Sequence, residues 1–153
     1  MPDAVEARLA DLGLKLPAAP APAANYVPYL LSGGLLFVSG QLSRSGDGGI
    51  KGTLGAGLSL EDGQKAAQLA CLNLLAQVKA ALGSFDRVGQ TLRLTGFVNA
   101  TADFRDHPVV INGASDLLVA VLGDKGRHTR AAIGASSLPS GFAVEIDAIF
   151  AAA

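Results

Sequence analysis

The stretch RAAIGASSLPSGFAVEIDAIF, residues 130–150, is the part of the sequence that decides the fold. In its second half every other residue is apolar, which is the period of a strand with one buried face: Phe142, Val144, Ile146, Ala148 and Phe150. A Leu-Pro-Ser-Gly turn separates this run from a first, shorter run that begins at Arg130. The stretch therefore predicts two final strands, and the short loop between them favours an antiparallel hairpin.

Three further strands are expected upstream. Residues 26–31 and 35–41 are apolar runs separated by Ser-Gly-Gly, a sequence that supplies the positive φ angles of a tight hairpin. Residues 91–98 alternate between apolar and polar side chains, which predicts another strand. The run Leu-Leu-Phe-Val at 35–38 does not alternate, so we expect both of its faces to be covered, one by helices and one by another subunit.

Two long helices are predicted between these strands. Ser59 followed by Asp62 resembles a capping box, and Gly83 is placed to end the helix that follows. Asp106 is a candidate cap for the second helix, with Pro108 in its first turn and Gly123 at its end. The first helix carries apolar residues on one face, as does the second: Ala67, Ala70, Cys71, Leu74, Val78, Ala81 and Leu82, then Val110, Ala114, Leu117, Leu118 and Val121.

The element order is therefore ββαβαββ, which predicts an α+β fold with a mixed β-sheet and two helices on one face. Residues 3–14 add a short amphipathic N-terminal helix, and PAAPAPAA at 17–24 forms an extended tether because successive prolines favour polyproline geometry. We divide the chain into residues 1–24, helix and tether, and a main domain at 25–153, and expect the helix to be separable from the main core. The glycine-rich segment 45–57 is interpreted as a surface loop rather than a phosphate cradle.

Composition limits the classes of partner. The 153 residues carry 12 Lys and Arg against 13 Asp and Glu, so no broad field favours nucleic acid or an anionic membrane. Half of the residues are hydrophobic and only 16% are charged, which favours an oligomer. Prolines interrupt the uncharged segment 16–43 too often for a spanning helix. Charged residues at the N-terminus and a single cysteine, Cys71, favour the cytoplasm.

Few residues could carry metal or nucleophile chemistry. His107 and His128 are the two histidines, and with Cys71 they do not form a set with zinc-ligand spacing. We therefore expect neither a metal nor a cofactor. No Ser/His/Asp arrangement is legible in the sequence, and we interpret both histidines as surface or structural residues. The eight aromatic residues do not interleave with basic ones, which disfavours RNA binding.

The strand ending in Ser-Gly-Gln at residues 36–41 and the stretch 130–150 together resemble the two signatures of the RidA/YjgF family, also described as endoribonuclease L-PSP-like. The family pattern has Ser-Gly-Gln at the end of a strand, and later an Arg, a Leu-Pro turn and alternating Val/Ile and Glu. The resemblance extends from about Tyr26 to Phe150. It implies a chorismate-mutase-like fold and a homotrimer with three intersubunit clefts that bind small carboxylates. Active family members hydrolyse enamine and imine intermediates released by pyridoxal-phosphate enzymes.

The resemblance also implies roles for individual residues. It makes Arg130 the carboxylate-binding arginine and Glu145 the glutamate that positions water, with Tyr26, Ser39 and Asn112 lining the cleft. Ala132 stands where the deaminating members often have Cys. Two functions therefore remain open. One is a 2-iminobutanoate/2-iminopropanoate deaminase-like hydrolase that converts imines such as 2-aminoacrylate to 2-keto acids and ammonia. The other is a non-catalytic trimer that binds keto or imino acids as a sensor or protein-interaction module.

The side-chain chemistry of Arg130 is compatible with both a site and a purely structural role. A guanidinium offers a planar fork of donors that matches a carboxylate bidentately, which suits an anchor for an amino-acid-derived acid. In the predicted hairpin, however, Arg130 would lie opposite Glu145, and the two could form a structural cross-strand ion pair. The sequence does not choose between them.

Overall fold

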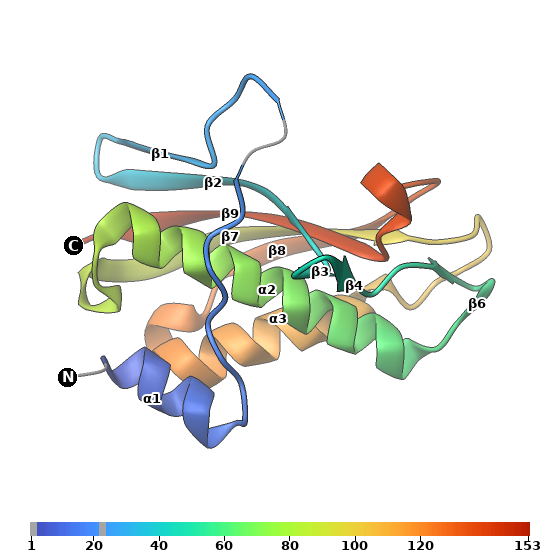
Figure 1. Cartoon of the computed structure of the whole chain (residues 1–153), viewed down its shortest axis with the longest axis horizontal. Coiled ribbons are helices and arrows are strands. Elements are labelled where there is room, and N and C mark those ends of the chain that lie inside the picture. Colours follow the sequence, from blue (N-terminus) through green and yellow to red (C-terminus); the bar gives the residue numbers. More distant parts are fainter. Residues whose placement is uncertain (1–2, 22–23) are drawn as a thin grey trace.

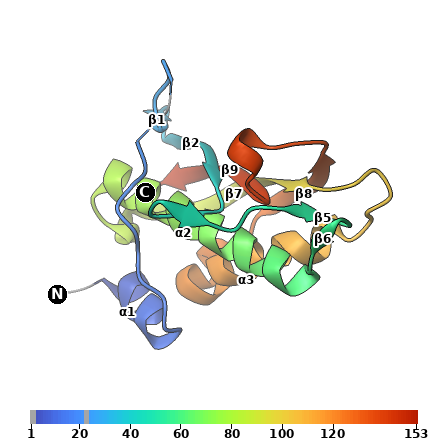
Figure 2. The same ribbon diagram turned by 45° about the vertical axis from the view of Figure 1, so that its right-hand side comes forward.

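The computed structural model describes residues 3–21 and 24–153, and its centre is a five-stranded sheet in the order β1-β2-β9-β7-β8. The strands are β1 (Tyr29–Ser32), β2 (Leu35–Leu42), β7 (Val88–Asn99), β8 (Thr129–Ala135) and β9 (Val144–Ala152). Neighbouring strands are antiparallel except β7 and β8, which are parallel. Helices α2 (Leu60–Leu82) and α3 (His107–Leu122) lie under one face (Figures 1 and 2). The predicted mixed α+β architecture is confirmed.

Local signals set the ends of the two helices largely as expected. The Ser59 hydroxyl accepts a hydrogen bond from the Asp62 backbone N–H at 3.1 Å, and Gly83 ends α2 in the left-handed conformation. Pro108 lies in the first turn of α3 and Gly123 follows its last residue. Asp106 is the N-cap residue of α3, as predicted, but its side chain makes no capping hydrogen bond. Within the described residues, no helix is long and apolar enough to cross a membrane.

The connections contain only short elements. The glycine-rich segment forms two-residue strands, β3 (Arg44–Ser45), β4 (Gly48–Gly49), β5 (Thr53–Leu54) and β6 (Gly57–Leu58). Three 3-10 turns, η1 (Phe85–Arg87), η2 (Gly123–Gly126) and η3 (Pro139–Gly141), complete the connections. Most residues of the glycine-rich segment 45–57 are exposed, in agreement with the predicted surface loop.

The predicted hairpin between the last two strands is wrong. Strand β7 lies between β8 and β9 and pairs with both of them. The reason is α3, which crosses from the end of β7 back to the start of β8 and so makes these two strands parallel neighbours. The loop after β8 then passes the end of β7, where Asn99 donates from its backbone N–H to the Ala143 carbonyl at 2.9 Å.

The N-terminal helix α1 (Ala4–Asp11) packs against α3. Val5 and Leu9 are 6% and 1% exposed and belong to the same buried cluster as the sheet and helices. Asp3 caps α1 and also accepts from the Phe85 backbone N–H at 3.1 Å, while Arg8 donates to the Val121 carbonyl at 2.8 Å. The division of the chain at residue 24 stays a prediction.

The tether crosses over α2 on its way from α1 to β1 (Figure 1). The Gln77 side-chain amide of α2 donates to the Pro20 carbonyl at 2.6 Å, which fixes the tether to the helix. Pro22 and Ala23 lie outside the described residues.

Candidate functional site

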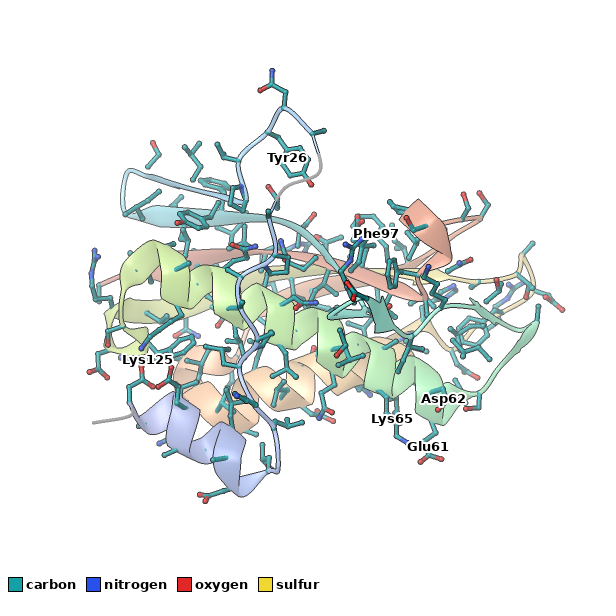
Figure 3. All side chains as sticks on the ribbon, viewed as in Figure 1. Tyr26, Glu61, Asp62, Lys65, Phe97 and Lys125 are labelled. Atoms are coloured by element: carbon teal, nitrogen blue, oxygen red, sulfur yellow. The ribbon has the colours of Figure 1, made fainter. Side chains whose placement is uncertain are left out.

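The sheet register places Arg130 and Glu145 on opposite faces. Leu94 of β7 pairs with Arg130 on one side and with buried Ala148 on the other, so the three side chains face the helices. Phe97 lies three positions after Leu94 on β7, so its side chain points to the opposite face. Phe97 pairs with Glu145 on one side and with Ile133 on the other, and these three side chains therefore face away from the helices. Figure 3 shows Phe97 on the side of the sheet that carries no helix. Within one chain, the predicted anchor and the predicted water-positioning residue do not meet.

Arg130 is held by α3. Its Nη1 donates to the Asn112 Oδ1 at 2.9 Å and to the Ser115 hydroxyl at 3.1 Å, and its Nη2 reaches the Pro108 carbonyl at 3.4 Å. All three acceptors are neutral, and within residues 3–21 and 24–153 no carboxylate pairs with Arg130. The alternative of a structural ion pair with Glu145 is therefore wrong. The positive charge of Arg130 is oriented and half-buried but not neutralised by the protein.

An open depression adjoins the Arg130 guanidinium. It encloses about 430 Å³ and is lined by Ser115, Val119, Arg127, His128 and Arg130. The His128 Nε2 lies 2.9 Å from the Ser115 hydroxyl, and the His128 Nδ1 lies 2.6 Å from the Gly126 carbonyl oxygen. The charges that line the depression are cationic, which suits an anionic ligand. A small carboxylate is of the size that such a depression can hold.

Glu145 occupies a different environment on the helix-free face. Its carboxylate lies against Gly40 of the Ser-Gly-Gln motif, where an added Cβ would meet the Glu145 Oε2 at 2.9 Å. Glycine at position 40 therefore leaves the space that this carboxylate occupies. Partial burial raises the pKa of Glu145 above its usual value, and the charge of Asp147 raises it further. A carboxyl group with a raised pKa is a better proton acceptor than an ordinary carboxylate.

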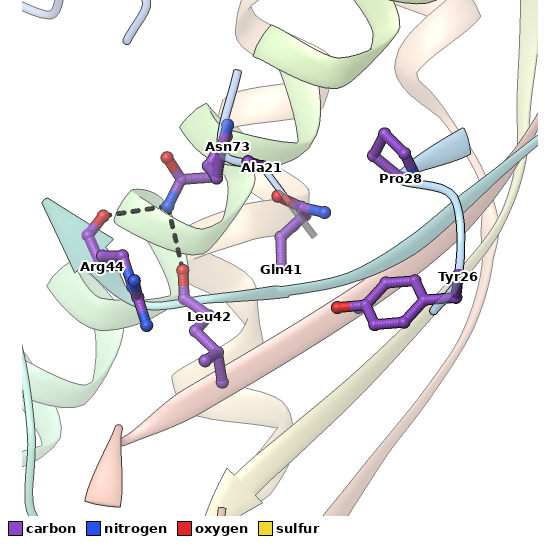
Figure 4. Close-up of a pocket in the computed structure, with 9 residues that line it drawn as sticks. Ala21, Tyr26, Pro28, Gln41, Leu42, Arg44 and Asn73 are labelled. Carbon is purple, nitrogen blue, oxygen red and sulfur yellow. Dashed lines mark hydrogen bonds between the residues drawn. The ribbon is translucent and has the colours of Figure 1, made fainter. Parts of the chain in front are cut away.

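Tyr26 lies just before β1, and Ser39 lies in β2 next to Gly40. Tyr26 is half-exposed and lines a cavity of about 90 Å³ that also includes Gly40, Gln41 and Asn73 (Figure 4). The Ser39 hydroxyl donates to the Val27 carbonyl at 2.7 Å, so it holds the segment before β1 in place. Gly40 lines this cavity together with Tyr26 and also lies against the Glu145 carboxylate.

The predicted site residues thus fall into two groups. Arg130 and Asn112 are bonded to each other on the helix side. Glu145 lies against Gly40 from the other face, while Tyr26 shares with Gly40 a cavity that also reaches Asn73 of α2. The sequence interpretation did not include Ser115 and gave His128 only a surface or structural role. One signal was available, because Ser115 follows Asn112 by three residues on a helix and His128 precedes Arg130 by two on an extended segment. Both spacings place the pairs on shared faces.

The remaining reactive groups do not form a metal centre. Among the described residues, no cluster of three or more His, Cys, Asp or Glu side chains could hold a metal ion. Cys71 is a free, fully buried thiol whose Sγ lies 3.6 Å from the Ala114 carbonyl, and burial raises its pKa. A buried protonated thiol is a poor nucleophile, so Cys71 is part of the core.

Comparison with known proteins places the chain in a family. A family model described as "YjgF/chorismate mutase-like, putative endoribonuclease" matches residues 6–149. Protein TCP17 of Trypanosoma cruzi is 50% identical over 147 residues, covering 95% of this chain and 92% of TCP17. The crystal structure of Atu1372 from Agrobacterium tumefaciens is 46% identical with a TM-score of 0.92, covering 99% of this chain and 95% of Atu1372.

A more distant structure shares the fold. TdcF of Escherichia coli, solved with bound serine, is 24% identical with a TM-score of 0.64, covering 87% of this chain and 92% of TdcF. The family model spans both long helices, all but the last three residues of the sheet and all but the last residue of the two sequence signatures, and the two nearer relatives match almost the whole chain. The chain therefore belongs to the YjgF/RidA, chorismate-mutase-like family.

Proposed function

We propose that this protein hydrolyses small enamine and imine intermediates such as 2-aminoacrylate to 2-keto acids and ammonia. The observation that carries the proposal is the state of Arg130, whose guanidinium is held by three neutral acceptors and has no carboxylate partner among the described residues. Asn112 and Ser115 both accept from Nη1, and the Pro108 carbonyl takes one hydrogen of Nη2, so the Nε hydrogen and the second Nη2 hydrogen would bind a ligand carboxylate bidentately.

A complete site would need a second copy of the chain. Arg130 and Glu145 face opposite sides of one sheet, so they can act on one ligand only when they come from different subunits. The helix-free face is also rich in apolar side chains, which supports burial against another copy. These include Leu30, Phe37 and Ile133, which are 57%, 41% and 46% exposed, together with Phe97 and Ile149. We propose a homotrimer with the clefts at its three subunit contacts.

The hydrolytic chemistry needs few groups. A protonated imine carbon is already electrophilic, so water must only be oriented and lose a proton as it adds to that carbon. An enamine becomes this iminium ion by taking up a proton at its methylene carbon. Glu145 would accept the water proton and return it to the nitrogen, so that the C–N bond breaks and ammonia leaves. Glu145 would then take the hydroxyl proton as the C=O bond of the ketone forms. The raised pKa of Glu145 supports this exchange, because the carboxyl group can both accept and donate a proton at moderate pH. Arg130 would hold the substrate carboxylate throughout.

The class of ligand is consistent with a structure of the same fold. TdcF was solved with bound serine, a small amino acid that carries a carboxylate. We further propose a cytoplasmic location, since the only cysteine is a free, buried thiol.

Ala132 favours the second candidate, a non-catalytic trimer that binds keto or imino acids. Ala132 faces the same side of β8 as Arg130, two positions along the strand, and offers no functional group there. The two candidates share the carboxylate anchor and differ only in turnover.

The deaminase proposal predicts faster keto-acid release in a coupled assay. A serine dehydratase generates 2-aminoacrylate, and pyruvate formation is followed with and without this protein. We expect a clear acceleration that depends on protein concentration and is lost in Glu145→Gln, because the amide cannot accept the water proton. Glu61→Gln, which makes the same change at an exposed carboxylate near the start of α2, is the matched control and should retain activity. No acceleration, combined with measurable pyruvate binding, would leave the binding module as the function.

The trimer is tested by light scattering at micromolar concentration. We expect three times the mass of one chain, because the apolar helix-free face is buried in the assembly. Phe37→Asp places a charge in that face and should give monomers that retain their helical circular dichroism. Leu60→Asp, at the exposed first position of α2, is the control and should leave the trimer intact. A monomeric mass for the unaltered protein would contradict the proposed intersubunit site.

A further inference from the structure

The surroundings of the Arg130 guanidinium contain a second layer of polar contacts that the proposed reaction does not use. Ser115 lies on α3 three residues after Asn112, so both side chains project from the same helix face toward β8. Both accept from the same nitrogen, the Nη1 of Arg130. The two acceptors together fix the plane of the guanidinium, which a single bond would not do.

His128 determines how the Ser115 hydroxyl is oriented. A carbonyl oxygen only accepts, so the 2.6 Å contact with the Gly126 carbonyl requires a proton on the His128 Nδ1. In the neutral ring the Nε2 is then an acceptor, and the Ser115 hydroxyl must donate its only proton to it across 2.9 Å. The lone pairs of that oxygen are consequently left for the Nη1 of Arg130. The result is a directed chain of hydrogen bonds from Arg130 through Ser115 and His128 to the Gly126 carbonyl.

The residues at both ends of this chain of hydrogen bonds belong to backbone segments that pack closely against neighbouring helices. At Gly113, between Asn112 and Ser115, an added Cβ would collide with the Gln64 carbonyl of α2, so α3 is pressed directly against α2. At Gly126, an added Cβ would collide with the Leu118 carbonyl of α3, which fixes the carbonyl that orients His128. Ser115 and His128 are therefore held on rigid elements, as positioning residues require.

We propose that Ser115 and His128 are positioning residues that aim the Arg130 guanidinium at the carboxylate of the ligand. The inference rests on the proposed function, because it assumes that Arg130 binds that carboxylate. Neither residue needs to touch the ligand. Their contribution is that Arg130 is already oriented before binding, so less conformational freedom is lost when the ligand arrives.

The test is a titration of the full-length protein with 2-oxobutanoate by calorimetry. Ser115→Ala removes the acceptor and should raise Kd about fivefold, which corresponds to roughly 1 kcal/mol. Ser115→Thr keeps the hydroxyl and should restore binding. His128→Phe keeps a planar ring without either nitrogen and should weaken binding in the same direction. Asp116→Ala, the exposed next residue on α3, is the control and should bind like the unaltered protein.

A double-mutant cycle separates positioning from general damage to the fold. In an Arg130→Lys background, Ser115→Ala should have little further effect on Kd, because the group that it positions is gone. Equal weakening in both backgrounds, or an unchanged Kd in Ser115→Ala, would overturn the role of Ser115. His128→Phe binding as tightly as the unaltered protein would overturn the role of the imidazole. If the unaltered protein does not bind 2-oxobutanoate at all, the proposed function fails and this inference fails with it.

Discussion

Replacing Arg130 by lysine is expected to weaken carboxylate binding about tenfold or more while leaving the melting temperature nearly unchanged. Lysine keeps the positive charge but loses the planar fork, and a charge-assisted hydrogen bond contributes about 1.5–3 kcal/mol. The fold should be affected little, because the partners of Arg130 are neutral and partly exposed. Removal of the guanidinium in Arg130→Ala leaves acceptors that water can reach, so we expect a loss of stability within about 1 kcal/mol.

Two measurements on three variants decide the role of Arg130. Titration with pyruvate or 2-oxobutanoate gives Kd, and scanning calorimetry gives the melting temperature, for Arg130→Lys, Arg130→Ala and the control Arg87→Lys. Arg87 is exposed and contacts the Leu82 carbonyl at the end of α2, so its replacement should change neither quantity. Unchanged binding with a large drop in melting temperature would show that Arg130 is structural.

The sequence predicted the elements better than it predicted their neighbours. The helix ends follow from local chemistry, since Ser59, Gly83 and Pro108 act within their own turns. The neighbour of β8 depends on a crossover of more than 20 residues, and the short Leu-Pro-Ser-Gly connection gave a misleading local signal. A strand, helix, strand order is typical of parallel neighbours, so the order β7, α3, β8 already contained the correct pairing.

In the candidate site, too, the sequence predicted individual residues better than it predicted which of them are neighbours. Arg130 and Asn112, two residues that the family resemblance placed in one cleft, are in direct contact, and their roles in binding a ligand stay a prediction. The opposite facing of Arg130 and Glu145 was missed together with the strand order, because a strand inserted between two others changes which faces their side chains share. Ser115 and His128 were missed because neither belongs to a recognisable motif. Their chemistry arises only from contacts between α3, η2 and β8.

The packing of α1 leads to the largest expected effect on stability. Leu9 is 1% exposed and belongs to the main buried cluster, so Leu9→Ala should remove its buried contacts and leave a cavity beside α3. Such substitutions cost about 2–5 kcal/mol, which for a chain of this length lowers the melting temperature by roughly 5–15 °C. Leu12→Ala is the matched control, because Leu12 is 52% exposed and its replacement should cost at most about 0.5 kcal/mol. Both variants are melted at the same protein concentration, since assembly makes the melting temperature depend on it. Equal melting of the two variants would show that α1 is separable from the core, as the proline tether had suggested.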